Sequence, residues 1–112
     1  MFSDEARTTI EAELERGRRA RADGFEGRAR VCARRAAGVA VREFFRLSGT
    51  NVIGSAHELL KQVEEQAGIS PRAKQSAALL LTRVDEDFRL ADGVDLLQEA
   101  RALANDLESA LQ

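Results

Sequence analysis

The 112-residue chain has few of the residues on which disulfide-rich, β-rich and membrane proteins depend. Its single cysteine, Cys32, excludes an internal disulfide and a cysteine-based zinc site, and we expect this thiol to be buried. Tyr and Trp are absent and aromatic residues make up 4% of the chain, which argues against a sheet. No stretch approaches the ~18 apolar residues of a membrane span, and the N-terminus is acidic where a signal peptide is basic. We therefore expect a cytoplasmic protein.

The residues that are abundant point to helices. Alanine, leucine, arginine and glutamate dominate the chain, and all four favour helix formation. An apolar content of 44% with 32% charged residues is typical of a folded protein, and the length suits one domain over residues 1–112. The charge is uneven, because residues 1–50 hold eleven basic residues against eight acids and the remainder holds six against eleven. Such asymmetry can steer a partner or a second copy of the chain.

Apolar residues recur at three- and four-residue spacing in five segments, which predicts five helices. The expected segments run from Ser3 to Asp23, Phe25 to Leu47, Ser55 to Gln66, Ser70 to Ala91 and Leu97 to Leu111. Serine at the start of three segments and proline at position 71 are typical of first helical turns. Short connections favour antiparallel neighbours. The predicted fold is an all-α, antiparallel up-and-down bundle of four to five helices.

The same spacing predicts which residues form the core. The inward face of the second helix is expected to comprise Ala29, Cys32, Ala33, Ala36, Ala37, Ala40, Phe44 and Leu47. That of the fourth helix is expected to comprise Ala73, Ala77, Leu80, Leu81, Val84 and Phe88. Small residues from Ala33 to Ala40, with Gly38 among them, would let a neighbouring helix approach the second helix closely.

Two groups of residues are candidates for chemistry. His57, the only histidine, lies in a first helical turn and lacks the second histidine of a zinc-protease helix. Because no base or nucleophile accompanies it, we expect a hydrogen bond from His57 to the preceding loop. The acids Asp85-Glu86-Asp87, Asp92, Asp95 and Glu99 are the second group, for a divalent metal. Consecutive acids point in different directions around a helix, which favours a solvated face over a metal site.

The arginines of the first two helices have more than one interpretation. They are Arg16, Arg18, Arg19, Arg21, Arg28, Arg30, Arg34 and Arg35. They could contact phosphates, or they could pair with interleaved acids such as Glu13, Glu15 and Glu26. Because no aromatic stacking residues accompany them, a solvated or dimer-facing surface is favoured over nucleic-acid binding.

Several segments resemble the HEPN family of prokaryotic helical-bundle proteins. The alanine-rich run from Phe25 to Leu47 is similar to the family's second helix. Ala56-His57-Glu58-Leu59-Leu60 is similar to the helix that follows, which opens with a histidine before leucines. Many members carry Thr-Arg-Tyr-Pro-Asp after the fourth helix, and here Phe88-Arg89-Leu90-Ala91-Asp92 keeps the arginine and the aspartate. The resemblance covers most of the chain, is weakest over the first helix, and implies a helical bundle.

The chain lacks one pair of residues on which the family's ribonucleases depend, and this limits the functions that the resemblance implies. HEPN proteins include metal-independent endoribonucleases, toxin components and partners of small nucleotidyltransferases. The ribonucleases depend on an arginine followed after four to six residues by a histidine, and no histidine follows Arg83 or Arg89. Without that histidine, the acid-base chemistry lacks its proton carrier.

The resulting hypothesis is a non-catalytic, homodimeric binding or regulatory module for a nucleotide or a nucleotidyltransferase-like protein. Arg89 and Asp92 are its candidate ligand-binding site, with Arg83 and His57 behind them, and no catalytic residue, metal or cofactor is expected. One alternative is a metal-independent, toxin-like endoribonuclease with an altered motif. Another is a structural adaptor whose basic half binds an acidic partner. RNA is the less favoured partner, and no membrane contact is expected.

Overall fold

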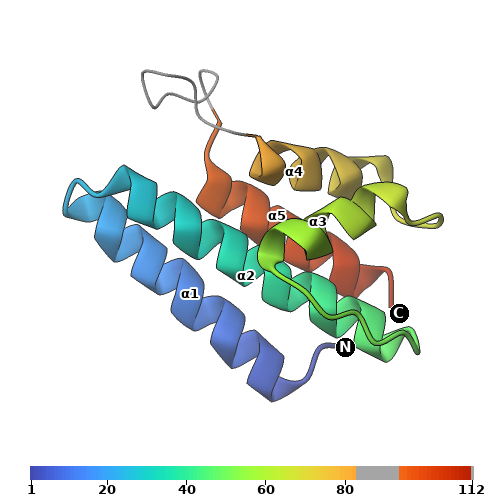
Figure 1. Ribbon diagram of the computed structural model, residues 1–112. Coiled ribbons are helices and arrows are strands. Elements are labelled where there is room, and N and C mark those ends of the chain that lie inside the picture. Colours follow the sequence, from blue (N-terminus) through green and yellow to red (C-terminus); the bar gives the residue numbers. More distant parts are fainter. Residues whose placement is uncertain (83–93, 112) are drawn as a thin grey trace.

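The computed structural model describes residues 1–82 and 94–111, which form five helices and no strand (Figure 1). The helices are α1 (Asp4–Ala22), α2 (Glu26–Leu47), α3 (Ala56–Glu65), α4 (Pro71–Leu81) and α5 (Leu96–Ser109). The predicted all-α class and helical bundle are confirmed. Within the described part of the chain, no helix is both long enough and apolar enough to cross a membrane.

Three helices begin at the serines that were predicted to cap them. The hydroxyl oxygens of Ser3, Ser55 and Ser70 accept the N–H groups of Ala6 (3.1 Å), Glu58 (3.2 Å) and Ala73 (3.1 Å). Each bond satisfies one of the amides that a helix leaves without an internal acceptor. At α3 the carboxylate of Glu58 also accepts a hydrogen bond of 3.3 Å from the Ser55 hydroxyl.

The helices are arranged around α2. This helix packs against α1, α3 and α5, while α4 packs against α3 and α5. α1 and α2 form an antiparallel hairpin (Figure 1). Ion pairs between α1 and α5 join Arg21 to Asp95, Glu11 to Arg101 and Arg7 to Glu108. Because the first residues of α1 meet the last residues of α5, α5 runs antiparallel to α1 and therefore in the same direction as α2.

This arrangement differs from a strict alternation of five helices, which would leave α5 parallel to α1. The difference arises after α2, because residues 48–55 run back along α2 and α3 begins beside Gly38 (Figure 1). In addition, α4 ends at Leu81 and Thr82 is extended, so the predicted helix to Ala91 is too long. Its expected core residues Val84 and Phe88 lie outside the described residues.

The core lies between the small face of α2 and leucines from the other helices. Ala29, Cys32, Ala33, Ala36, Ala37 and Ala40 are all at most 1% exposed, as predicted. The fully buried leucines are Leu14, Leu59, Leu60, Leu80, Leu96, Leu103 and Leu107. Short side chains on α2 therefore leave room for long ones from α1, α3, α4 and α5, which is the interlocking that close packing requires.

The C-terminal end of α2 departs from the predicted core. Phe44 is only half-buried and Leu47 is 39% exposed, whereas Val41 and Phe45 are buried. From Ala37 onward the inward face continues in four-residue steps, and these steps lead to Val41 and Phe45. The prediction that Leu47 belongs to the core was therefore wrong, and Phe44 packs against the edge of the core, not in its interior.

Carboxylates hold the N-terminal residues against the bundle. The Ser3 amide donates to Glu43 Oε2 of α2, and the Phe2 amide donates to Glu108 Oε2 of α5, both at 2.7 Å. Phe2 is only 4% exposed, so these bonds fix a side chain that belongs to the core. Hydrogen bonds from Arg46 and from the Ser3 amide lower the pKa of Glu43 from its ordinary 4.5 to about 2.

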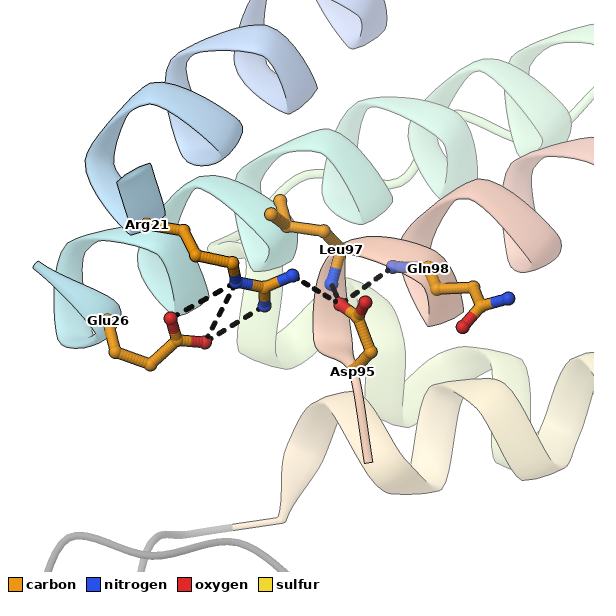
Figure 2. Close-up of polar contacts among 5 residues, drawn as sticks. All are labelled: Arg21, Glu26, Asp95, Leu97 and Gln98. Carbon is orange, nitrogen blue, oxygen red and sulfur yellow. Dashed lines mark hydrogen bonds and ion pairs between the residues drawn. The ribbon is translucent and has the colours of Figure 1, made fainter. Parts of the chain in front are cut away.

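A second polar centre joins the ends of three helices (Figure 2). Arg21, near the end of α1, donates to both carboxylate oxygens of Glu26 on α2 and, at 3.0 Å, to Asp95 before α5. Asp95 also accepts the amides of Leu97 and Gln98 at 3.1 and 3.3 Å, so it caps α5. The hydrogen bonds to Glu26 and Asp95 raise the pKa of Arg21. The guanidinium thus links α1, α2 and α5 at one end of the bundle.

We predict that Gly17→Ala destabilises the fold. A Cβ at position 17 would lie 2.5 Å from Leu97 Cδ2 and 3.2 Å from Cys32 Cβ, so α5 or α2 would have to move. Chemical denaturation should show a loss of about 1–3 kcal/mol in the free energy of unfolding. Gly27→Ala is the matched control, because its Cβ would meet only the end of Arg30 at 3.8 Å. Equal stability of the two variants would contradict this packing.

We predict that Glu43→Gln weakens the fold at neutral pH and flattens its acid sensitivity. A carboxyl whose pKa falls from 4.5 to about 2 on folding stabilises the fold above pH 4.5, and this contribution is lost as pH falls toward 2. The expected loss at neutral pH is on the order of 2 kcal/mol, measured by urea denaturation across pH. The exposed Glu64→Gln is the control. Parallel pH profiles for the wild type and Glu43→Gln would refute this role.

Candidate functional site

Of the candidate ligand-binding residues, only His57 lies in the described part of the chain. Arg83, Arg89 and Asp92 lie outside the described residues, as does the acidic run 85–87. His57 is the second residue of α3, and its exposed side chain forms no hydrogen bond with a described residue. The predicted hydrogen bond from His57 to the preceding loop is therefore not formed.

Two acids of the candidate metal group have structural partners. Asp95 caps α5 and binds Arg21 (Figure 2). Glu99 accepts a hydrogen bond of 3.0 Å from the buried hydroxyl of Ser76, which joins α5 to α4. Within residues 1–82 and 94–111, no three His, Cys, Asp or Glu side chains gather as metal ligands. These two acids therefore hold helices in place.

The arginines of α1 and α2 differ in their partners. Every arginine of α1, namely Arg7, Arg16, Arg18, Arg19 and Arg21, forms an ion pair with a carboxylate. These pairs include the acids Glu13, Glu15 and Glu26, so the predicted pairing with interleaved acids is confirmed for α1. On α2, Arg46 pairs with Glu43. The arginines of α2 that have no carboxylate partner among the described residues are Arg28, Arg30, Arg34, Arg35 and Arg42.

Two of these α2 arginines have evident structural roles. The guanidinium of Arg28 lies over the ring of Phe25, 4.9 Å from its centroid. Arg34 donates to the carbonyl oxygens of Leu80 (2.8 Å) and Thr82 (3.1 Å). Its positive charge therefore lies at the C-terminal end of α4, where the unpaired carbonyl groups make the helix dipole negative. Burial, together with the nearby charge of Arg30, lowers the pKa of Arg34.

Arg35 and Arg42 line one pocket of about 340 Å³ between α1, α2 and the first turn of α3. We call it the arginine pocket, and its lining residues are Glu13, Arg35, Gly38, Val39, Arg42, Gly54, Ser55, Ala56 and Leu59. The two arginines are seven residues apart, which places them on the same side of α2, roughly 10 Å apart along its axis. Gly38 lies between them.

The arginine pocket exists because α3 begins unusually close to α2. A Cβ on Gly38 would lie 3.0 Å from the Cβ and 3.2 Å from the Cα of Ala56, so glycine permits this approach. Gly54 turns the chain into α3 with a φ of 151°, a conformation that other residues rarely adopt. Ser55 then caps the helix. Arg42 donates to the Gly54 carbonyl at 3.4 Å, which fixes the loop to α2.

The charges around the arginine pocket favour an anion. Arg35 and Arg42 contribute two positive charges, and the first amides of α3 add the positive end of a helix. Glu13 opposes them from α1, but its Oε1 already accepts a hydrogen bond of 2.8 Å from Arg16. Its Oε2 is buried, with no donor among the described residues. The pocket therefore presents two guanidinium groups whose hydrogen-bonding capacity is largely unused.

A second arginine-rich pocket, between α1 and α5, is electrostatically different. It has a volume of about 270 Å³ and includes Arg18, Arg21 and Arg101. All three guanidinium groups are bound to carboxylates of this chain. An anion there would have to displace existing ion pairs, so the arginine pocket is the better candidate.

Sequence reasoning did not single out Arg35 and Arg42 as a pair. Arg35 was counted within a general basic surface, and Arg42 was only one of six arginines on the second helix. A signal was present, since the two arginines flank Gly38 at seven-residue spacing and a capped helix start follows. The spacing alone did not reveal that the loop returns to Gly38.

Comparison with known proteins places the chain in no family. No family model, no curated protein and no solved structure matches it. The geometry of the arginine pocket therefore carries the functional argument.

Proposed function

We propose that this chain is a non-catalytic, HEPN-like, homodimeric binding module that holds a nucleotide or related phosphate-bearing molecule in the arginine pocket. The observation that carries the proposal is the pairing of Arg35 and Arg42 around Gly38, without a carboxylate partner among the described residues. Every arginine of α1, by contrast, is neutralised by a carboxylate of this chain.

The chemistry of the arginine pocket suits a phosphate ester. Guanidinium groups match the oxygens of a phosphate in two-pronged hydrogen bonds, and a helix start adds amides directed at an anion. The volume of about 340 Å³ falls within the range of small-molecule sites. Val39 and Leu59 supply apolar wall next to the charges, which favours an organic phosphate over a bare anion.

The lining of the arginine pocket supports binding more than catalysis. The Ser55 hydroxyl accepts the Glu58 amide and donates to the Glu58 carboxylate, so it is engaged as a helix cap. Glu13 is held by Arg16, and His57 lies beside the lining residues on the exposed side of α3. The endoribonuclease alternative would use Arg83, Arg89 or His57. The two arginines lie outside the described residues, and the exposed His57 has no hydrogen-bonding partner among the described residues.

Self-association is the second element of the proposal. The end of α2 and the loop after it expose two apolar side chains, Leu47 at 39% and Ile53 at 90%. Burying such a side chain against a second copy is worth roughly 1.5–3 kcal/mol. Gly54 and Ser55 follow Ile53 in the chain and line the arginine pocket. A dimer formed through this loop would thus place the pocket beside the interface, where a nucleotidyltransferase-like partner or a shared ligand would bind.

We predict that nucleoside monophosphates bind this protein and that Arg35→Ala and Arg42→Ala each weaken the binding about tenfold or more. Each substitution removes charge-assisted hydrogen bonds to the phosphate. Isothermal titration calorimetry measures the effect. Arg35 has no ion pair or hydrogen bond with a described residue, so Arg35→Ala should unfold at the wild-type temperature, whereas Arg42→Ala also loses the 3.4 Å hydrogen bond to the Gly54 carbonyl and should unfold at a slightly lower temperature.

The matched controls are Arg18→Ala and Arg19→Ala, which remove exposed arginines that pair with Glu15 away from the pocket. Their affinity for the nucleotide should equal that of the wild type. A protein that binds no nucleoside monophosphate, or that loses binding equally in all four variants, would contradict the proposed site.

We predict that the chain sediments as a dimer and that Ile53→Asp shifts it to the monomer. A charge at this position cannot be buried against a second copy without a large desolvation cost. Val31→Asp is the control, because Val31 is 44% exposed on α2 away from the loop. Sedimentation equilibrium measures the mass of each protein in solution. A monomeric wild type would contradict the proposed self-association.

A further inference from the structure

We infer that the arginine pocket accepts a ligand with one compact anionic group, such as a phosphomonoester, and rejects a polyanionic strand such as RNA. The inference rests on the proposed function, because it concerns the same two guanidinium groups. It assigns selectivity to carboxylates that share pockets with Arg42, chiefly Glu5, Glu13 and Glu43.

The arginine pocket continues along the groove between α1 and α2. A neighbouring pocket of about 510 Å³ shares Val39 and Arg42 with it. Its α1 wall includes Glu5 and Thr9, and Glu13 stands on the wall of the arginine pocket. The three residues are spaced by four, so they lie along one side of α1. A strand leaving the arginine pocket in this direction would follow that row.

The charges of the neighbouring pocket are already balanced. Glu43 accepts hydrogen bonds of 2.7 and 3.1 Å from Arg46, so this guanidinium is occupied. The lowered pKa of Glu43, about 2, keeps its carboxylate charged at every physiological pH. Glu5 adds a second, exposed carboxylate. A phosphate placed here would meet two carboxylates and would have to share Arg42 with the arginine pocket.

A further carboxylate, that of Glu58, lies beside Gly54, whose carbonyl oxygen accepts a hydrogen bond from Arg42. The Glu58 carboxylate lies so close to Gly54 that a Cβ on Gly54 would be 2.6 Å from its Oε2. Its Oε1 accepts the Ser55 hydroxyl at 3.3 Å. Carboxylates of α1, α2 and α3 therefore lie around the Arg42 end of the basic pair, with Glu13 on the side wall. A strand that left the arginine pocket at this end would meet these carboxylates, whereas a single anionic group would not.

Electrostatic repulsion from these carboxylates should make the protein bind a single phosphate group more tightly than a strand of several phosphates. The phosphates adjacent to a bound one in a strand would lie within the roughly 8 Å over which charges interact at physiological ionic strength. Each close contact between a phosphate and a carboxylate should weaken binding by about five- to tenfold. A phosphomonoester, which directs its neutral sugar toward the groove, avoids this repulsion.

Competition at the pocket tests the inference. A fluorescent nucleoside monophosphate is bound first and is then displaced by adenosine monophosphate or by a 5′-hydroxyl oligoadenylate, compared at equal phosphate concentration. We expect the oligonucleotide to compete about tenfold more weakly or worse. In the variant Glu5→Gln, which alters only the neighbouring pocket, the affinity for the oligonucleotide should rise about five- to tenfold, while the affinity for adenosine monophosphate should change less than about threefold.

The control is Glu15→Gln, which removes a carboxylate from another side of α1 and should leave both competitors unchanged. Equal or stronger competition by the oligonucleotide on the wild-type protein would overturn the selectivity but leave the anion site intact. Unchanged competition by the oligonucleotide in Glu5→Gln would overturn the role of the acids. Failure of the fluorescent monophosphate to bind at all would contradict the proposed function, and with it this inference.

Discussion

The small side chains of α2 are the constraint on which the rest of the structure depends. Its buried alanines let leucines of the four other helices reach the centre of the bundle, and Gly38 lets α3 begin against its backbone. On α1, Gly17 plays the corresponding part opposite Leu97 and Cys32. A larger side chain at either glycine would separate helices whose contacts form the core, since packed interiors tolerate little added volume.

The same helix explains why a site forms where it does. The inner side of α2 is small and apolar, while its outer side carries arginines that have no acids at pairing distance in the described chain. The loop that returns from the end of α2 brings the start of α3 to Gly38, midway between Arg35 and Arg42. Close packing thus positions a helix terminus beside two guanidinium groups. The carboxylates of α1 and α3 limit the extent of that positive region.

Much of the fold followed from the sequence, because helix periodicity and capping are local properties. The stripe Ala29, Cys32, Ala33, Ala36, Ala37 and Ala40 is buried as predicted, and three serines cap their helices. The return of residues 48–55 along α2 could not be foreseen, because it depends on the fit of Ala56 to Gly38. The site was missed for a related reason. Whether an arginine such as Arg35 has a partner depends on which acids the fold places nearby, and the candidates from the family resemblance, Arg83, Arg89 and Asp92, lie outside the described residues.

The central claim is that Arg35, Arg42 and the start of α3 form one anion-binding unit. The most direct measurement is an NMR titration of the isotope-labelled protein with inorganic phosphate, following the arginine Nε–H resonances and the backbone amides. The account predicts saturable shifts at Arg35, Arg42, Ala56 and His57, with Arg18, Arg21 and Arg101 unchanged because carboxylates already hold them. Saturable shifts confined to Arg18, Arg21 and Arg101, or no saturable shift at Arg35 and Arg42, would contradict it.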